Sequence, residues 1–362
     1  MKTSKLILYL SVTISGIGLF TSCDSANEQQ QNPEISTGLY VLNSGKMGSN
    51  NASLTYYDLT DSTITADVFT TKNNRGLGDT GKDIVKYGSR IYIAVYKSSL
   101  IEVIDAKTGI SQKNISMVNT SNQPSLPRSL AVCNGKLYVS LYDGHVAQID
   151  TATLTVEKTI AVGSNPEGIA VANSKLYVAN SGGKQTPKDS TVSVINLSDF
   201  TLINTIKVGL NPSIVKADSY GDVYVLSLGN YSTITPMFQR IDASTQKSTV
   251  ISDVKAWNFT ITDDYAYLYN FDYDSSNAAV NKSYIIYDVK NEKISNASFI
   301  VSDAIAKTPY SIDVDPVTKY IYIGETDYKN TGKMYCFDQN GTLKYSFATG
   351  VNPQKTLFIT NK

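Results

Sequence analysis

The sequence predicts an all-β fold in which one small antiparallel unit is repeated seven times around a ring. The main observation is a short apolar-Tyr-apolar phrase that usually follows a Gly, Asn or Asp turn, as expected for a strand entered from a tight turn. The tyrosines at the centre of the phrase are Tyr40, Tyr92, Tyr138, Tyr177, Tyr224, Tyr267 and Tyr322. A chain of 362 residues also exceeds the length at which one hydrophobic core stops growing, so it requires a repeat array or several domains.

A second recurring segment, which we call the opener, precedes six of the tyrosine phrases and predicts the strand before them. The openers begin at Gly81, Pro127, Pro166, Pro212, Ala256 and Pro309. Successive openers are 46, 39, 46, 44 and 53 residues apart, which is the length of four short antiparallel strands and their turns. Such a unit is one blade of a β-propeller. A β-sandwich is the alternative, but it has no reason to repeat the same side chain at the same place in every unit.

The N-terminal residues 1–22 are predicted to be a lipoprotein signal peptide, with two lysines before an apolar stretch too short to span a bilayer as a mature helix. The end of this stretch, LFTSC at 19–23, resembles a bacterial lipobox, which implies lipidation at Cys23. Ordinary signal cleavage beside a chance cysteine is the alternative. Residues 23–37 are rich in Asn and Gln and are expected to form a lipid-anchored flexible linker.

The predicted propeller spans residues 38–362 and is closed by its two ends. The first tyrosine phrase, at Tyr40, has no opener before it, whereas the chain ends with an opener at 352–359 that has no tyrosine phrase after it. The two halves complete one blade, so the C-terminal strand is expected to pair inside the N-terminal blade. This pairing removes the open sheet edges and yields a seven-bladed ring.

The predicted binding face is the mouth of the ring, formed by the loops that enter the innermost strand and leave the second strand of each blade. Core positions repeat the same apolar types, whereas positions at the mouth differ from blade to blade. Aromatic side chains are expected there at Trp257, Tyr310, Tyr96, Tyr142 and Phe271, and hydrogen-bonding or charged ones at Arg128, Gln354, Lys82, Glu167, Asn43, Asn180 and Asn270. The longer loops 181–190, 228–237 and 270–281 should rise on the same face.

This mixture of side chains is typical of a site for a large amphipathic small molecule, such as a corrin ring with peripheral amides or an oligosaccharide. Simple solvation of variable loops is the alternative interpretation. Trp257, the only tryptophan, is the strongest single candidate, and its alternative role is to fill the central channel.

Composition and motifs argue against several other functions. Lys and Arg together number 32, as do Asp and Glu, so no global positive field attracts nucleic acid. The single histidine, His145, lies in a turn without an evident partner set, and the sequence contains no hydrolase, zincin or phosphate-loop motif. Asp272 and Asp274 are interpreted as a solvated loop rather than as calcium ligands. We expect a non-catalytic protein without a bound metal or catalytic cofactor, although carboxylate chemistry by Glu167 with Glu325 follows no spacing rule that excludes it.

Three stretches of one repeat, NPEGIAV at 165–171, KLYVANS at 175–181 and SVIN at 193–196, closely resemble the YVTN-type propeller repeat of bacterial surface and periplasmic proteins. The likeness covers residues 38–362. The many tyrosines and the segment GLYVLNSG at 38–45 resemble the seven-bladed surface lipoproteins of gut Bacteroidetes. This group includes the type that captures cobalamin for a TonB-dependent outer-membrane transporter.

The resemblance implies a lipoprotein that is held in the outer membrane by Cys23 and faces the cell exterior. Asp24 and Glu28, close to Cys23, resemble the signal that sends lipoproteins of some Gram-negative bacteria to that face. Cobalamin or a related corrinoid would be its ligand rather than a catalytic cofactor, and a TonB-dependent transporter its partner. A glycan-binding or protein-docking module is one alternative, and a propeller hydrolase or lyase is another.

Overall fold

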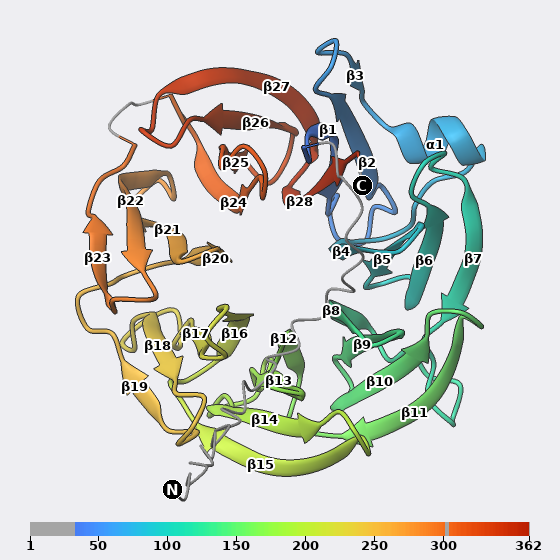
Figure 1. The fold of residues 1–362 in the computed structure, drawn as a ribbon, viewed down its shortest axis with the longest axis vertical. Helices are drawn as coiled ribbons and strands as arrows, with labels where there is room; N and C mark the ends of the chain where they lie inside the picture. Colours follow the sequence, from blue (N-terminus) through green and yellow to red (C-terminus); the bar gives the residue numbers. More distant parts are fainter. Residues whose placement is uncertain (1–32, 301–303, 362) are drawn as a thin grey trace, which may run out of the picture. The chain divides into compact units, whose positions relative to one another are not determined.

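The computed structural model describes residues 33–300 and 304–361, whose strands form seven four-stranded antiparallel sheets, the blades, around a central axis (Figure 1). The seven-bladed β-propeller predicted from the sequence is confirmed. The predicted signal peptide at 1–22, the lipidation site Cys23 and the linker as far as residue 32 lie outside the described residues. The first strand begins at Ser36, so the last two residues of the predicted linker belong to the propeller.

We number the blades from the one that contains the first strand. Blade 1 consists of β28 (Pro353–Thr360), β1 (Ser36–Asn43), β2 (Ser53–Asp58) and β3 (Ile64–Thr65). Blade 2 consists of β4 (Gly81–Tyr87), β5 (Arg90–Val95), β6 (Leu100–Asp105) and β7 (Ser111–Ser116). Blade 3 consists of β8 (Pro127–Cys133), β9 (Lys136–Leu141), β10 (His145–Asp150) and β11 (Thr155–Ala161).

The remaining blades follow in chain order. Blade 4 consists of β12 (Pro166–Ala172), β13 (Lys175–Asn180), β14 (Thr191–Asn196) and β15 (Thr201–Lys207). Blade 5 consists of β16 (Pro212–Ala217), β17 (Val223–Ser227), β18 (Met237–Ile241) and β19 (Ser248–Val250). Blade 6 consists of β20 (Asn258–Thr262), β21 (Tyr265–Tyr273), β22 (Ala279–Asp288) and β23 (Lys293–Asn296). Blade 7 consists of β24 (Thr308–Val314), β25 (Ile321–Thr326), β26 (Thr331–Phe337) and β27 (Leu343–Val351).

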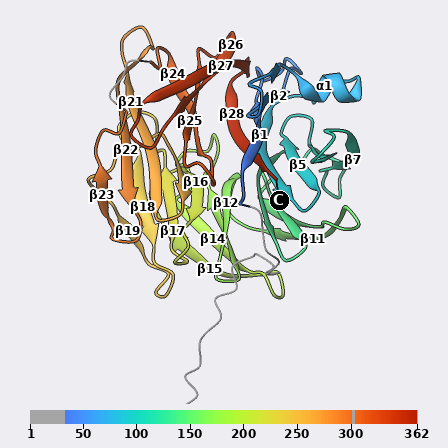
Figure 2. The same ribbon diagram turned by 45° about the horizontal axis from the view of Figure 1, so that its top comes forward.

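The ring is closed in blade 1, where strands from the two ends of the propeller pair. β28 runs antiparallel to β1, with Tyr40 opposite Leu357 and Val41 opposite Thr356, and the two strands lie side by side in Figure 2. Just past the end of β1, the amide of Ser44 donates to the carbonyl of Asn352 at 2.9 Å. The closure predicted from the unmatched opener and tyrosine phrase is therefore present, and it leaves no inner edge of blade 1 open.

The repeated tyrosines lie on the second strand of each blade and fill the space between neighbouring blades. Tyr92, Tyr177 and Tyr224 have no exposed surface. The hydroxyl of Tyr224 in blade 5 donates to the carbonyl of Val289, which follows the third strand of blade 6, at 3.3 Å. A tyrosine supplies a large apolar ring and one polar tip that needs a partner when buried. Burial of the ring is common to all seven repeated tyrosines, which explains why the residue is repeated.

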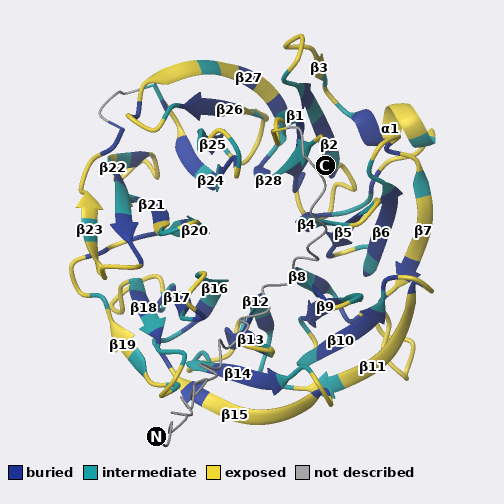
Figure 3. Cartoon of the chain, viewed as in Figure 1, coloured by how far each residue is buried: buried dark blue, intermediate teal, exposed yellow. Residues whose placement is uncertain are grey.

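Burial is greatest in the second and third strands of the blades, is partial in the inner strands and is least in the outer strands (Figure 3). The outer strands β11 and β15 are almost wholly exposed, whereas β5, β9 and β13 are almost wholly buried. Blade 1 differs because its outer strand β3 has two residues, and the helix α1 (Val68–Asn73) follows and packs on β2. Asp67 caps this helix, since its carboxylate accepts from the amide of Thr70 at 3.3 Å. In the described part of the chain, no helix has both the length and the apolar character needed to cross a membrane.

Candidate functional site

The side chains at the mouth are placed by a β-bulge that recurs at the start of the inner strands. Among the described residues, six inner strands shift register against their second strand directly after their first or second residue. In β4, for example, Gly81 and Asp83 pair with consecutive residues of β5, which leaves Lys82 as the extra residue. A bulge bends the strand and redirects the extra side chain. Of the predicted site residues, the bulges hold Lys82, Arg128, Glu167, Tyr310 and Gln354.

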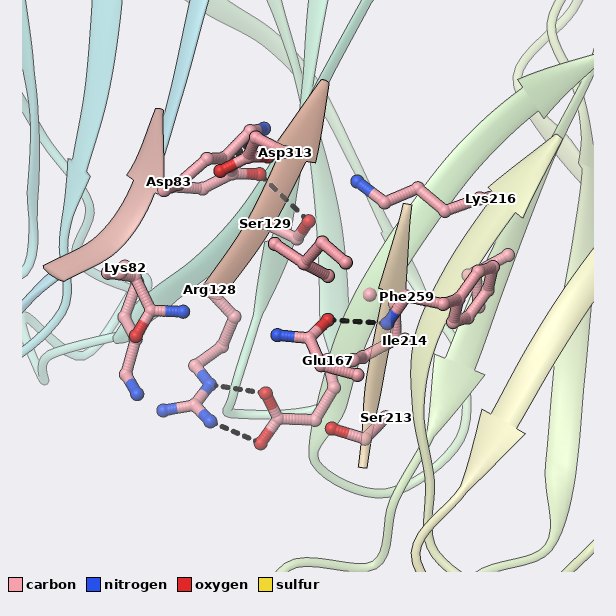
Figure 4. Close-up of a pocket in the computed structure, with 16 residues that line it drawn as sticks. Lys82, Asp83, Arg128, Ser129, Glu167, Ser213, Ile214, Lys216, Phe259 and Asp313 are labelled. Carbon is pink, nitrogen blue, oxygen red and sulfur yellow. Dashed lines mark hydrogen bonds and ion pairs between the residues drawn. The ribbon is translucent and has the colours of Figure 1, made fainter. Parts of the chain in front are cut away.

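The inner strands enclose a cavity of about 220 Å³ on the axis, and its lining is strongly charged (Figure 4). The charged side chains that line it are Lys82, Asp83, Arg128, Glu167, Lys216, Asp313 and Lys355. Four of the predicted site residues, Lys82, Arg128, Glu167 and Gln354, belong to this lining. The predicted aromatic residues do not, so the cavity suits a charged or polar group rather than an apolar one.

Arg128 is held rigidly at the mouth end of this cavity. Its guanidinium donates through Nε to Oε2 of Glu167 at 2.7 Å and through Nη2 to Oε1 of the same carboxylate. The rings of Tyr96 and Tyr142 flank it, with their centroids 4.7 Å and 4.9 Å from Cζ. The two rings meet edge to face, with centroids 5.9 Å apart. A bidentate carboxylate and two aromatic contacts leave the guanidinium little freedom to rotate.

Lys82 lies in the neighbouring blade, beside Arg128. Within residues 33–300 and 304–361 its ammonium makes no hydrogen bond or ion pair. Burial, together with the positive charge of Arg128, lowers the pKa of Lys82 to about 8 against the opposing effect of Glu167. Lys82 is therefore a lysine whose charged form is disfavoured by its surroundings.

A second layer of charge lies deeper on the axis, where strands of blades 1 and 2 meet. Asp83 forms an ion pair with Lys355 at 2.5 Å between Oδ1 and Nζ. Its Oδ2 accepts from the hydroxyl of Ser129 at 2.9 Å and from the amide of Leu130 at 2.7 Å. Burial alone would raise the pKa of Asp83, but the nearby lysines and these donors outweigh burial and lower it. Asp83 therefore stays ionised and holds blades 1, 2 and 3 together at the axis.

Lys216 on blade 5 and Asp313 on blade 7 complete the deeper layer. The Oδ2 of Asp313 accepts from the amide of Thr356 at 2.7 Å, and burial raises the pKa of the Asp313 carboxyl. Burial lowers the pKa of Lys216, as does the charge of Lys355, and Lys216 forms no ion pair among the described residues. Two lysines of the cavity, Lys82 and Lys216, are thus left without a direct partner.

Three of the predicted aromatic residues, Trp257, Phe271 and Tyr310, lie beside the cavity rather than in it, on blades 6 and 7. The indole of Trp257 stacks on Phe271, with ring centroids 5.6 Å apart and an interplanar angle of 22°, and its Nε1 donates to the carbonyl of Phe271 at 2.7 Å. On the side of blade 5, Tyr231 lies parallel to the indole at 6.5 Å. Trp257 is half-buried and is fixed between these two rings. It therefore presents part of its surface at the mouth instead of filling the channel.

The aromatic surface continues from Phe271 into blade 7. Phe271 contacts Tyr273 edge to face at 5.1 Å, and the hydroxyl of Tyr273 lies 3.2 Å from that of Tyr328. Tyr328 in turn contacts Tyr310 edge to face at 5.9 Å. We call the set Tyr231, Trp257, Phe271, Tyr273, Tyr328 and Tyr310 the aromatic arc. Tyr231, Tyr273 and Tyr328 are 61%, 46% and 45% exposed, so the arc offers flat apolar faces to solvent.

Three of the predicted amide side chains do not reach the cavity. Asn43 and Asn180 are fully buried, and each donates through Nδ2 to two hydroxyls on the third strand of its own blade. Asn270 is half-buried in β21 and is absent from the cavity lining. The reason is the alternation of side chains along a strand, which turns the last residue of β1 and β13 into the blade. Gln354, by contrast, lines the cavity and accepts from the hydroxyl of Ser44 at 3.0 Å.

Sequence reasoning missed the deeper charges and part of the aromatic arc. Asp83, Lys216, Asp313 and Lys355 carry a detectable signal, because each is a charged residue inside a predicted inner strand. Tyr231, Tyr273 and Tyr328 lie in or beside the loops expected to rise at the mouth, but their contacts join different blades. No spacing within one repeat encodes such contacts.

The other chemical candidates stay at the surface. His145 is 43% exposed and its Nδ1 lies 3.1 Å from Oδ1 of Asp143. Asp274 accepts from the backbone amides of Ser276 and Ala278, which is the pattern of a tight turn. In the described ranges, no three His, Cys, Asp or Glu side chains are grouped so that they could hold a metal ion.

Comparison with known proteins supports the fold and leaves the activity open. Residues 37–358 match the family described as "Domain of unknown function (DUF5074)". No sequence among the curated proteins matches the chain. Hydrazine synthase of Kuenenia stuttgartiensis is similar in structure, with a TM-score of 0.62 and 18% identity over 76% of this chain and 88% of that one.

Two further solved structures are similar. Dihydro-heme d1 dehydrogenase NirN, solved in complex with DHE, has a TM-score of 0.58 and 13% identity over 92% of this chain and 77% of that one. The computationally designed Ika8 protein has a TM-score of 0.56 and 10% identity over 87% and 89%. At these identities the likeness concerns the fold alone.

Proposed function

The chain belongs to the DUF5074 family, and we propose that it is a non-catalytic binding protein that holds a large amphipathic small molecule, cobalamin or a related corrinoid, at the mouth of the propeller. The observation that carries the proposal is the pairing of an exposed aromatic arc with a charged cavity at one mouth. Both features come from positions that vary between blades, whereas the tyrosine scaffold beneath them is repeated.

The two halves of the mouth suit different parts of one ligand. The aromatic arc on blades 5 to 7 offers flat faces on which a macrocycle can stack. Lys82, Arg128 and Gln354, on blades 2, 3 and 1, offer donors to polar substituents. A corrinoid combines a broad ring with many peripheral amides, so it uses both halves at once.

The mouth is also preformed, which favours binding. Trp257 is stacked on both sides and hydrogen-bonded, and Arg128 is fixed by Glu167 and two tyrosines. Side chains that are already ordered lose little conformational entropy when a ligand arrives.

Catalysis has less support, because His145 lies at the surface with Asp143 as its neighbour.

We further propose that the protein is lipid-anchored at Cys23 in the outer membrane, faces the exterior, and passes its ligand to a TonB-dependent transporter. This part of the proposal rests on the sequence of the N-terminal segment and on the family resemblance. A rigid propeller at the end of a short linker suits such a handover, because the linker sets the reach and the propeller keeps the site intact.

The proposal is tested by replacing Trp257 and Tyr310 together with alanine and measuring cyanocobalamin binding by calorimetry. We expect affinity to fall by about 10- to 100-fold, because truncation of aromatic anchors at the centre of an interface typically costs about 2 kcal/mol or more. The fold should persist, because the seven repeated tyrosines that pack between the blades are unchanged.

Tyr220→Ala is the matched control, since Tyr220 is an exposed tyrosine on the turn between β16 and β17, at the end of the blade away from the mouth. It should bind cyanocobalamin like the wild type. Unchanged affinity of the Trp257/Tyr310 variant for cyanocobalamin would show that the ligand does not bind at the aromatic arc. Binding of an oligosaccharide panel, with no response to any corrinoid, would instead assign the mouth to a glycan.

A further inference from the structure

The charges that line the cavity do not balance. Glu167 is paired with Arg128, and Asp83 with Lys355. The lining holds four cations but only three acids, and the third acid, Asp313, accepts a hydrogen bond from the amide of Thr356. Lys82 and Lys216 then remain as cations without an ion pair in the described part of the chain. The empty space on the axis is therefore bordered by an excess of positive charge.

The excess is most accessible where Lys82 and Arg128 meet at the mouth. Both residues lie at bulges of neighbouring inner strands, and Figure 4 shows the ammonium of Lys82 next to the guanidinium of Arg128. Glu167 takes the N–H groups on one side of the guanidinium, at Nε and Nη2. An arginine carries five N–H donors, so donors remain on the side away from Glu167.

This arrangement has the features of an anion site that is already formed. The guanidinium is fixed by Glu167 and by the rings of Tyr96 and Tyr142, so its free donors keep a constant direction. Lys82 carries a pKa of about 8 because burial and Arg128 both disfavour its positive charge. An anion between the two groups would relieve their repulsion and supply the partner that Lys82 lacks.

We propose that the ligand bound at this mouth carries an anionic group, a carboxylate or a phosphate ester, and that this group binds between the ammonium of Lys82 and the guanidinium of Arg128. The inference rests on the proposed function, because it names the chemical class of the ligand of the same mouth. The aromatic arc then holds the flat part of the ligand, and the Lys82–Arg128 pair holds its charged part.

The first test uses inorganic phosphate as the probe and Lys82→Gln as the variant. Thermal unfolding is measured in phosphate and in sodium chloride of the same ionic strength. Phosphate should raise the Tm of the wild type by several degrees more than that of Lys82→Gln, because only the wild type offers both cations. Lys82→Met serves as a second variant of similar length.

The Tm of Lys82→Gln without phosphate distinguishes a binding role of Lys82 from a structural role. Because the ammonium of Lys82 has no partner, its removal should leave the Tm in chloride unchanged or higher. Lys175→Gln is the matched control, since Lys175 is a half-buried lysine at the start of β13, the end of the blade away from the mouth. It should respond to phosphate like the wild type. Equal phosphate effects in the wild type and Lys82→Gln, including no effect in either, overturn the anion site.

The second test uses two corrinoids, of which only one carries the anionic group. Cyanocobalamin contains a phosphodiester within its nucleotide loop, whereas dicyanocobinamide lacks the whole loop. Lys82→Gln should lose at least 10-fold in affinity for cyanocobalamin and keep its affinity for dicyanocobinamide. Equal losses for both ligands, or no loss for either, overturn the proposal. If the wild type binds no corrinoid, the proposed ligand is wrong, and the phosphate comparison alone decides the anion site.

Discussion

At the residue scale, Asp218 is a partly buried carboxylate of which only one oxygen is hydrogen-bonded. Asp218 lies in the turn between β16 and β17, and its Oδ1 accepts from the amides of Tyr220 and Asp222 at 2.9 Å each. Its Oδ2 is buried and has no hydrogen-bond partner among the described residues. Burial, reinforced by the charge of Asp222, raises the pKa of Asp218 to about 6.

This shift predicts how stability depends on pH. An acid whose pKa is raised in the folded state binds its proton more tightly there than in the unfolded chain. Its contribution to stability is therefore present below about pH 4 and is lost as the pH rises through 6. Asp218→Asn removes the charge but keeps an oxygen at the turn. Its Tm relative to the wild type should thus improve between pH 5 and pH 7.5, by the equivalent of about 1 kcal/mol after allowance for solvent screening.

Asp242→Asn is the matched control for this prediction. Asp242 also caps a turn, through the amides of Ser244 and Thr245, but it faces solvent, and the donors around it lower its pKa. Its replacement should destabilise the protein equally at pH 5 and pH 7.5. Thermal unfolding of the three proteins at both pH values measures the effect. A pH-independent difference between Asp218→Asn and the wild type would show that Asp218 is ionised throughout.

Single residues also mark the limit of sequence-based prediction. The positions of Lys82, Arg128, Glu167 and Gln354 were identifiable because each follows the opener residue of its blade, and all four line the cavity. Asn43 satisfied the same kind of positional rule at the exit of the tyrosine strand, yet its side chain turns into the blade. The position of a residue in the repeat shows at which end of a strand it lies. The direction of its side chain depends in addition on the pleat of the strand and on the β-bulge.

At the element scale, the bulge and the closing strand are the features that create the mouth. The tyrosine phrase and the opener predicted the second and first strands, because both carry strong strand patterns and turn signals. The helix α1 was not expected, since it replaces most of one outer strand and has only two buried apolar residues, Val68 and Phe69. The β-bulges were not expected either, because a one-residue register shift depends on the partner strand.

The closing strand gives a prediction at this scale. A chain that ends at Asn352 lacks β28, so β1 is left with an open edge and the Asp83–Lys355 pair is lost. We expect this chain to lose cooperative thermal unfolding, because the ring then opens and the axis is exposed. Circular dichroism during heating measures the transition.

A chain that ends at Thr360 keeps all of β28 and is the control for the truncation. Its Tm should stay within a few degrees of that of the full chain. If the chain that ends at Asn352 unfolds with the same cooperative transition and Tm, strand exchange in blade 1 does not hold the ring closed.

At the scale of the whole molecule, a regular scaffold carries an irregular mouth. The inner strands contact one another around the axis, which fixes the relative positions of residues from different blades. The aromatic arc lies on blades 5 to 7, whereas the Lys82–Arg128 pair, with Tyr96 and Tyr142 against Arg128, lies on blades 2 and 3. This asymmetry was predictable in outline from the variation among blades. The separation of the aromatic arc from the Lys82–Arg128 pair was not predictable, because it arises from contacts between residues far apart in the sequence.

The most direct test of this account is the position of cyanocobalamin in a crystal structure of its complex with the protein. We expect the corrinoid at the mouth, with one face against Trp257 and its phosphodiester within hydrogen-bonding distance of Lys82. A corrinoid bound against the outer strands, or at the end of the axis away from Trp257, would contradict the claim that recognition takes place at this mouth.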